Sequence, residues 1–285
     1  MHDGMHGIYK VLHPDKYFND YLTEDNRPDG RKFNDHRNVK LNVNCIGTSE
    51  TSAVVKCGNT TVICGIQLEL VTPKPEEPDL GFMIVNVEMP SMSSNKIRPG
   101  PPSDHAQVIN NVVSDIILNS KCVDLKDLCI VHDKLAWVLH CDAICMDNDG
   151  SLVDACVIGL MTCLKTLSLP TVKFDPETEE IKVDEVERIP LKISGLPVAT
   201  SFCLLEQNKR IITLTEPTSF EEEMCGGVGA HLIVSWNESL LIGMQKFGGC
   251  NLTPENQKEA MKIAKIRSKL IHDIIDTCIK NKSKK

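Results

Sequence analysis

Three groups of residues in this sequence carry side chains that could do chemistry, and the first is acidic. Glu221, Glu222 and Glu223 form a run whose carboxylates could ligate a divalent cation. Three consecutive side chains diverge around a helix or alternate along a strand, so they do not converge on one ion. We therefore expect the run to form a solvated or interface face, and we predict no metal site there.

Thirteen cysteines form the second group. The sequence has no CxxC pair, and Cys141 and Cys145 stand four residues apart in a predicted strand, a spacing that does not suit a zinc site. The number of cysteines is odd, and many lie within apolar runs, as Cys64 and Cys156 do. This pattern predicts buried free thiols in a reducing compartment, with no disulfide framework and no metal or other cofactor.

The third group is a basic stretch at the end of an acidic chain. The net charge of -8 argues against a free-standing nucleic-acid-binding protein, because neutralising phosphates requires a basic surface. Between residues 258 and 285, however, nine Lys or Arg residues face three acidic ones. Two interpretations remain open for this stretch: a solvated helix face with a frayed tail, or a contact with RNA or an acidic partner.

The elements that must position these residues follow from hydrophobic periodicity. Alternation from Val39 to Cys45 predicts a strand, and Gly58-Asn59 predicts a tight turn between the strands 52–57 and 60–70. Further strands are expected at 82–89 and at 135–145, the latter nearly all apolar and therefore central. An apolar stripe predicts a helix over 105–119, and a second helix follows the turn 147–150 and runs to about Leu167.

The second half repeats this pattern. Strands over 198–205, 210–214, 230–236 and 240–246 are expected to form two hairpins, followed by a long helix that starts at Thr253-Pro254-Glu255. Each half is predicted to be an antiparallel meander followed by helices, so the fold class is α+β with an internal duplication. The predicted organisation is an N-terminal extension (1–22), a first lobe (23–169), a connection (170–195), a second lobe (196–280) and a basic tail (281–285). We find no apolar stretch long enough to span a membrane and no secretory signal, so no membrane partner is expected.

Several stretches resemble the RNase PH family. They are NRPDGR at 26–31, GNTTVICG at 58–65, Asp149-Gly150 with Asp154-Ala155, and Glu216-Pro217-Thr218 followed by the acidic run. The resemblance spans roughly residues 22–280, and within the family it is greatest to one eukaryotic type of RNA exosome ring subunit. It implies the RNase PH fold, in which two β-α lobes each resemble the second domain of ribosomal protein S-five.

The resemblance also implies where catalytic residues would lie, and all three requirements are unmet. Active members carry Ser or Thr followed by Arg after the turn at 149–151, where this chain has Leu152 and Val153, with Asp154 behind them to repel phosphate. The start of this helix still offers amide donors, so weak anion binding there stays open. Arginines that grip RNA along the helix 105–119 correspond to Asn111, Asp115 and Leu118. The catalytic carboxylate and its companion correspond to Ala230 and to a position near Met224; a slip of one or two residues restores no arginine, since none lies between Arg98 and Arg188.

The resemblance therefore implies a non-catalytic subunit of the hexameric exosome ring. Expected partners are other RNase PH-like ring subunits in a hetero-hexamer, RNA-binding cap subunits, and RNA threaded through the channel. Lys96 and Arg98 occupy the loop that lines the channel neck in related subunits, and two interpretations stay open for them: solvated surface cations, or a weak, sequence-independent contact with RNA phosphates. The expected locations are the nucleus, the nucleolus and the cytoplasm. Two alternatives remain: an active phosphate-dependent 3′-to-5′ exoribonuclease and a stand-alone RNA-binding module.

Overall fold

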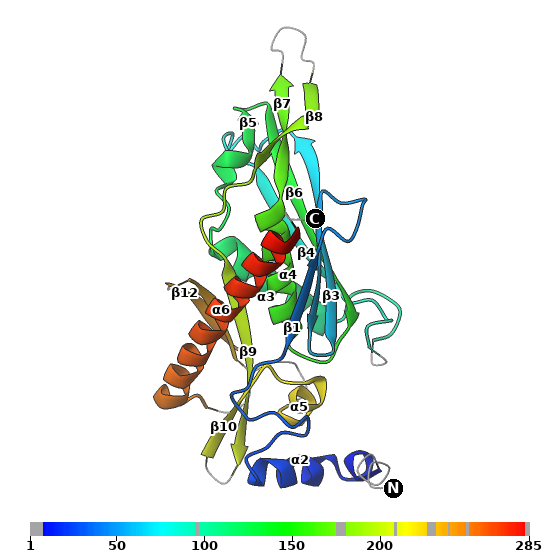
Figure 1. Ribbon diagram of the computed structural model, residues 1–285, viewed down its shortest axis with the longest axis vertical. Helices are drawn as coiled ribbons and strands as arrows, with labels where there is room; N and C mark the ends of the chain where they lie inside the picture. Colours follow the sequence, from blue (N-terminus) through cyan, green and yellow to red (C-terminus); the bar gives the residue numbers. More distant parts are fainter. Residues whose placement is uncertain are drawn as a thin grey trace.

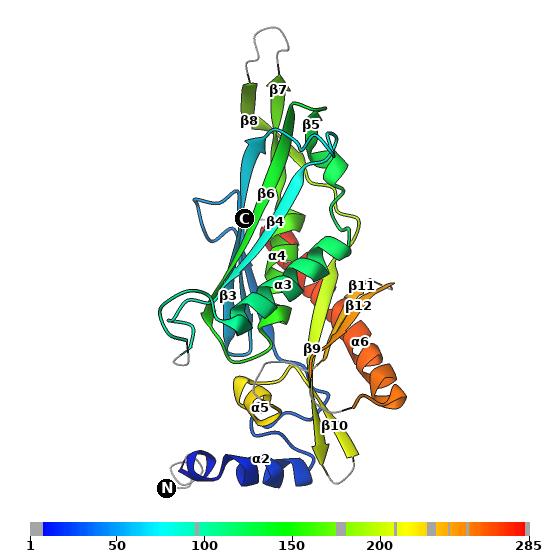
Figure 2. The ribbon, with the colours of Figure 1, turned by 180° about the vertical axis from the view of Figure 1, so that it is seen from behind.

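A mixed sheet forms one half of the molecule in the computed structural model, which describes residues 8–94, 97–174, 181–207, 210–226, 232–238, 240–248 and 251–282. The strands of this sheet are β1 (Val39–Val43), β2 (Thr51–Cys57), β3 (Thr60–Val71), β4 (Phe82–Glu88), β5 (Cys129–Val131) and β6 (Leu135–Asp147). They lie in the order β1-β2-β3-β6-β4, and β5 pairs with β6 (Figures 1 and 2). The central position expected for β6 is confirmed.

One part of the first lobe differs from the predicted meander. β4 pairs with β6 in parallel, whereas the other pairs in this sheet are antiparallel. The chain between these two strands includes helix α3 (Asp104–Asn119) and the short helix η1 (Leu125–Leu128). A parallel pair requires such a long crossover, and it is the crossover, which local alternation does not reveal, that sets the direction of β4.

Helix α4 (Leu152–Thr166) is the centre of the structure. All residues from Leu152 to Leu164 are buried, because the helix packs on β2 and β3 on one side and on β9 of the second sheet on the other. A helix that is apolar on all sides requires such an environment. Its Gly159 lies so close to β3 that a Cβ there would overlap the Cys64 sulfur. One hydrophobic core therefore runs through both halves of the chain, from Val39 to Ile275.

The second sheet contains β9 (Pro197–Gln207), β10 (Arg210–Thr215), β11 (Leu232–Asn237) and β12 (Leu240–Lys246), in the order β10-β9-β11-β12. All its pairs are antiparallel, and both predicted hairpins are confirmed. The short helix α5 (Ser219–Met224) follows β10, and the long helix α6 (Pro254–Lys282) packs on β9, β11 and β1. The predicted α+β class, with a sheet and a long helix in each half, is confirmed.

The connection between the two halves is more ordered than a simple linker. Its two alternating stretches form β7 (Ser168–Phe174) and β8 (Ile181–Pro190), an antiparallel pair that makes a separate two-stranded sheet at one end of the molecule (Figure 1). At the other end lies the N-terminal segment, helical over residues 8–12 and again in α2 (Pro14–Thr23). Tyr17 and Phe18 of α2 contact the ring of Phe220 edge-on and dock the segment on α5.

The outer edge of β1 is covered by the end of α6. The Cys278 thiol donates to the Leu41 carbonyl over 3.4 Å, and Lys282 Nζ donates to the Val43 carbonyl over 3.2 Å. An uncovered edge strand offers unpaired backbone groups to other chains, and α6 removes two such acceptors here.

Candidate functional site

The turn before α4 is the place where the sequence analysis puts the phosphate-binding residues. Gly150 has φ 82° and Ser151 has φ 51°, so both lie in the left-handed region. A Cβ at Gly150 would come within 2.5 Å of the Pro217 carbonyl oxygen, which makes glycine necessary here. The Thr60 hydroxyl donates to the Gly150 carbonyl over 2.7 Å and accepts from the Asp149 N–H over 3.0 Å. The turn is thereby fixed to strand β3.

Arg37 ties the same turn to the second half of the chain. Its buried guanidinium donates to the carbonyls of Asp149 over 2.7 Å and Pro217 over 2.6 Å. Its backbone N–H donates to Glu216, whose carboxylate also pairs with Arg267 of α6 at 2.5 Å. Burial alone would raise the pKa of Glu216, but the nearby His36, the Arg267 charge and the hydrogen bond from the Arg37 N–H together lower it. The guanidinium of Arg37 thus stabilises the fold by binding backbone carbonyls of this chain.

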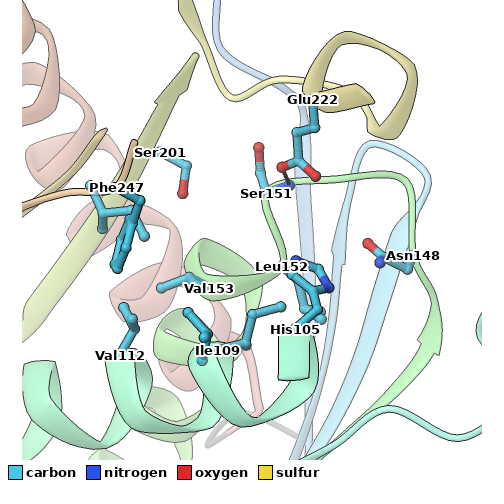
Figure 3. A pocket seen from close by; sticks show the side chains of 12 residues that line it. His105, Ile109, Val112, Asn148, Ser151, Leu152, Val153, Ser201, Glu222 and Phe247 are labelled. Atoms are coloured by element: carbon cyan, nitrogen blue, oxygen red, sulfur yellow. Dashed lines mark hydrogen bonds between the residues drawn. The ribbon is translucent and has the colours of Figure 1, made fainter. Parts of the chain in front are cut away.

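A carboxylate from this chain caps the turn where an anion would bind. Glu222 Oε1 accepts a hydrogen bond of 2.9 Å from the Ser151 N–H, the amide at the start of α4 (Figure 3). Burial raises the pKa of Glu222 to about 7, with Asp149 and Glu221 adding to the rise and Ser151 and Arg37 opposing it. Amides at a helix N-terminus attract anions, so Glu222 takes one of the donors that a phosphate would need.

The expectation of a solvated acidic run is therefore wrong for two of its three members. Glu221 is buried and forms an ion pair with Arg27, and with Thr218 it completes a capping box at the start of α5. Glu222 is half-buried, and Glu223 is exposed. The three side chains diverge around α5, as expected, but two turn inward because buried donors on other segments meet them. The pattern Thr-x-x-Glu at 218–221 was the available sequence signal for this helix.

A small apolar cavity of about 150 Å³ lies beside this turn. Figure 3 shows its walls, which come from α3, the start of α4, β9, α5, β11 and the segment after β12. The lining side chains are His105, Val108, Ile109, Val112, Asn148, Ser151, Leu152, Val153, Ser201, Glu222, Ile233 and Phe247. Burial lowers the pKa of His105, which favours its neutral form. Among the described residues, no Lys or Arg lines the cavity, and Glu222 is its only acidic side chain.

Leu152 and Val153 lie where the sequence placed them, buried and facing this cavity. Asp154 does not face the cavity, so the expectation that it repels phosphate there is wrong. Its carboxylate turns toward β9 and accepts from the Ser201 N–H over 2.9 Å and from the Ser201 hydroxyl over 2.7 Å. Complete burial and the nearby Glu216 raise the pKa of Asp154 to about 8. The carboxylate at the rim of the cavity is Glu222, which the sequence analysis missed.

The three positions on α3 that correspond to the RNA-binding arginines of active family members lie close together in the structure. Asn111, Asp115 and Leu118 recur along one face of the helix and are all exposed. This face has no positive charge, so it cannot neutralise a phosphate backbone.

The remaining predicted positions lie apart from the cavity or outside the described residues. Met224 packs in a cluster with Phe18, Leu22, Cys203 and Leu214. Arg98 is exposed in the loop between β4 and α3, beside a groove that this loop forms with the end of β4. Ala230, Lys96 and the tail residues 283–285 lie outside the described residues.

Within the described part of the chain, no three His, Cys, Asp or Glu side chains come close enough together to hold a metal ion. None of its helices is both long and apolar enough to cross a membrane. No described cysteine forms a disulfide, and most of them are buried. The arrangement can hold a small molecule against apolar walls and a carboxylate, but its described residues offer no cationic side chain for phosphate.

Comparison with known proteins finds similarity to one family over most of the chain. Residues 35–170 match domain 1 of the 3′ exoribonuclease family RNase PH. "Exosome complex component rrp43" of Schizosaccharomyces pombe is 32% identical over 259 residues, which cover 90% of this chain and 93% of that protein. "Exosome complex component Rrp42" of Thermococcus kodakarensis is 37% identical over 207 residues, covering 72% of this chain and 74% of that protein.

A solved structure is similar over almost the full length. A chain of the Archaeoglobus fulgidus exosome with RNA bound to the active site superposes with a TM-score of 0.75 at 28% identity. The match covers 95% of this chain and 96% of that one.

Proposed function

The chain belongs to the RNase PH family, and from this we propose that it is a non-catalytic subunit of an RNA exosome ring. In this role it joins other RNase PH-like subunits in a hetero-hexamer, under RNA-binding cap subunits, and RNA passes through the central channel. It supports 3′-to-5′ processing and degradation of RNA, including ribosomal RNA maturation and messenger RNA turnover, by scaffolding. The relatives named as exosome components, which match 90% and 72% of the chain, support this role.

The observation that carries the non-catalytic proposal is the occupied turn before α4. Phosphorolysis needs a cradle for inorganic phosphate and positive charge for the transferring phosphoryl group. Here Glu222 accepts from the Ser151 amide, while Leu152 and Val153 present apolar side chains beside it. A phosphate at this place would meet a carboxylate and would lack a cationic partner. Catalysis in the assembly then belongs to other subunits.

We further propose that Lys96 and Arg98 contact RNA in the channel. Arg98 is exposed, and no described residue pairs with it, so its charge is available to phosphates. The proposed locations are the nucleus, the nucleolus and the cytoplasm. The proposed divisions of the chain remain 1–22, 23–169, 170–195, 196–280 and 281–285, with the lobes joined through the core around α4.

A paired experiment tests this function. The tagged chain is recovered from its own cells at mild salt, and the purified chain is assayed with a poly(A) substrate with and without inorganic phosphate. We expect a stoichiometric set of RNase PH-like and cap proteins, together with an inert isolated chain. Phosphate-dependent shortening by the isolated chain would mean an active exoribonuclease, whereas solitary recovery with salt-sensitive RNA binding would mean a stand-alone RNA-binding module.

A matched variant tests whether the turn before α4 contributes to catalysis in the assembly. Glu222→Ala removes the carboxylate from the turn, and we expect it to leave the phosphorolytic activity of a reconstituted assembly unchanged. Glu223→Ala, one residue further along the same helix and exposed, serves as the control for general effects on α5.

A further inference from the structure

The cavity beside the turn before α4 has the size of a known class of ligand site. A volume of about 150 Å³ matches that of an engineered apolar protein cavity that stays dry and binds benzene. One six-membered ring therefore fits between the walls that α3 and α4 provide. Ile109, Val112 and Val153 are buried and supply much of the apolar surface.

Among the described residues, the only formal charge at the cavity is negative. Glu222 Oε1 is held by the Ser151 amide, and no hydrogen-bond partner among the described residues engages Oε2. His105 favours its neutral form, so it adds no opposing charge.

A carboxylate fixed at the end of an apolar slot selects for a cation that carries an apolar body. A protonated amine or amidine gives Glu222 a charge-assisted hydrogen bond, and Asn148 and Ser201 add neutral acceptors and donors nearby. An anion of the same shape would meet the carboxylate and lose its hydration without compensation. The same walls that exclude phosphate thus favour the opposite charge.

We propose that this cavity is a binding site for a small organic cation, a single aromatic ring bearing an amine or amidine, with the ring between α3 and α4 and the cationic group on Glu222. The site is separate from the proposed ring assembly, because the isolated chain already contains all of its described walls. Failure of the ligand proposal therefore leaves the assembly proposal standing, and the reverse also holds.

Titration of the purified full chain with benzylamine tests the proposal, followed by NMR chemical-shift perturbation and by the unfolding temperature. Ethylbenzene is the uncharged isostere and benzoate is the anionic control. The titration is done at pH 8, where a carboxyl with a pKa of about 7 is mostly ionised. We expect benzylamine to bind about tenfold or more tightly than ethylbenzene, which is the ratio that one modest charge-assisted bond provides. Benzoate and inorganic phosphate are expected to show no saturable binding.

Three variants assign the binding to this cavity. Glu222→Gln keeps the size of the side chain and should remove the preference for benzylamine over ethylbenzene. Val112→Phe fills the cavity and should abolish binding of both ligands. Glu223→Gln is the matched control on α5 and should leave both affinities unchanged.

The unfolding transition of each variant verifies that it folds. If Glu222→Gln does not fold, two measurements remain. Val112→Phe decides whether the ligand occupies the cavity. The comparison of benzylamine with ethylbenzene in the unmodified chain decides the role of charge. Absence of benzylamine binding at millimolar concentration would overturn the proposal. Equal binding of benzylamine and ethylbenzene would also overturn it, as would tighter binding of benzoate or phosphate.

Discussion

The guanidinium of Arg27 donates two hydrogen bonds to the carboxylate of Glu221, which lies 194 residues further along the chain, and both side chains are almost completely buried. The remaining donors of Arg27 reach the carbonyls of Thr215 and Glu216 at the end of β10. The stretch before the first strand is thus joined to α5, the helix that also carries Glu222. By binding Glu221, Arg27 helps to position α5 and with it Glu222 in the wall of the cavity.

Loss of Glu221 should destabilise the fold strongly. Glu221→Ala leaves the buried Arg27 charge without its partner, and breaking a buried pair in this way costs about 3–5 kcal/mol in the free energy of unfolding. Urea denaturation measures the loss. Asp276→Asn is the control, since the Lys165–Asp276 pair is partly exposed (31% and 47%) and should contribute less than about 1 kcal/mol. Similar losses in the two variants would contradict the role assigned to Arg27.

Gly150→Ala should destabilise the turn before α4. The positive φ of Gly150 disfavours any L side chain, and a strained residue of this kind costs about 1–3 kcal/mol before the overlap with Pro217 is counted. The comparison is Gly47→Ala, where no heavy atom lies within 4 Å of the added Cβ and φ is not in the left-handed region. Thermal unfolding of both variants reveals the difference, and an unchanged Gly150→Ala variant would mean that the turn is not held as described.

Stability should fall as pH rises through the neutral range because of Asp154. The folded chain holds the Asp154 proton up to about pH 8, whereas the unfolded chain releases it near the ordinary value of 3.8. In this window the folded state binds more protons, so the free energy of unfolding decreases with pH, by at most about 1.4 kcal/mol per pH unit for one group. Glu222, raised to about 7, acts in the same direction between its ordinary value of 4.5 and that pH.

The lowered pKa of Glu216 has the opposite sign, and its contribution is lost only as pH falls through the acidic range, so it does not affect the window from pH 5 to 8. The lowered pKa of His105 also has the opposite sign and acts below its ordinary value of 6.5, but it is common to both chains and cancels in their comparison. Asp154→Asn removes one titrating group and keeps an acceptor for Ser201. Urea unfolding between pH 5 and 8 should therefore give a flatter profile for this variant than for the unmodified chain. A parallel pair of profiles would show that Asp154 is already ionised in the folded chain.

Charge reversal at Arg98 should weaken RNA binding by the assembled ring. A lost phosphate contact reduces affinity for all sequences alike and lowers the slope of log K against log salt by about one. Fluorescence anisotropy with a labelled poly(A) strand at several salt concentrations measures this for Arg98→Glu and for the double variant with Lys96→Glu. The exposed Lys192 offers a control reversal of the same charge in the connection between the halves. An unaltered slope in the double variant would remove this loop from the RNA path.

Local patterns predicted most of the strands and helices, because alternation and the helical stripe reflect burial of one face. The direction of β4 escaped this reasoning because it depends on the path of a crossover helix. Glu222 escaped it because its partner, the Ser151 amide, lies 71 residues away. Asp154 was expected to repel phosphate, yet its orientation depends on Ser201 of β9, and the distance between α4 and β9 is a tertiary property. The identities of Leu152 and Val153, by contrast, were sufficient to place apolar side chains at the site.

The reactivity of the buried thiols reports when the core of this protein opens. Cys57, Cys64, Cys141, Cys156 and Cys163 lie in the core that joins the two halves, and burial raises the pKa of each of them. An alkylating reagent reacts with thiolates, so these five thiols are expected to remain unmodified for as long as α4 stays buried between the two sheets. Exposed Cys45 is expected to react from the start. Because these sulfurs share one core, into which the second sheet also packs, their modification is expected to begin together, as a single event that marks the separation of the two sheets.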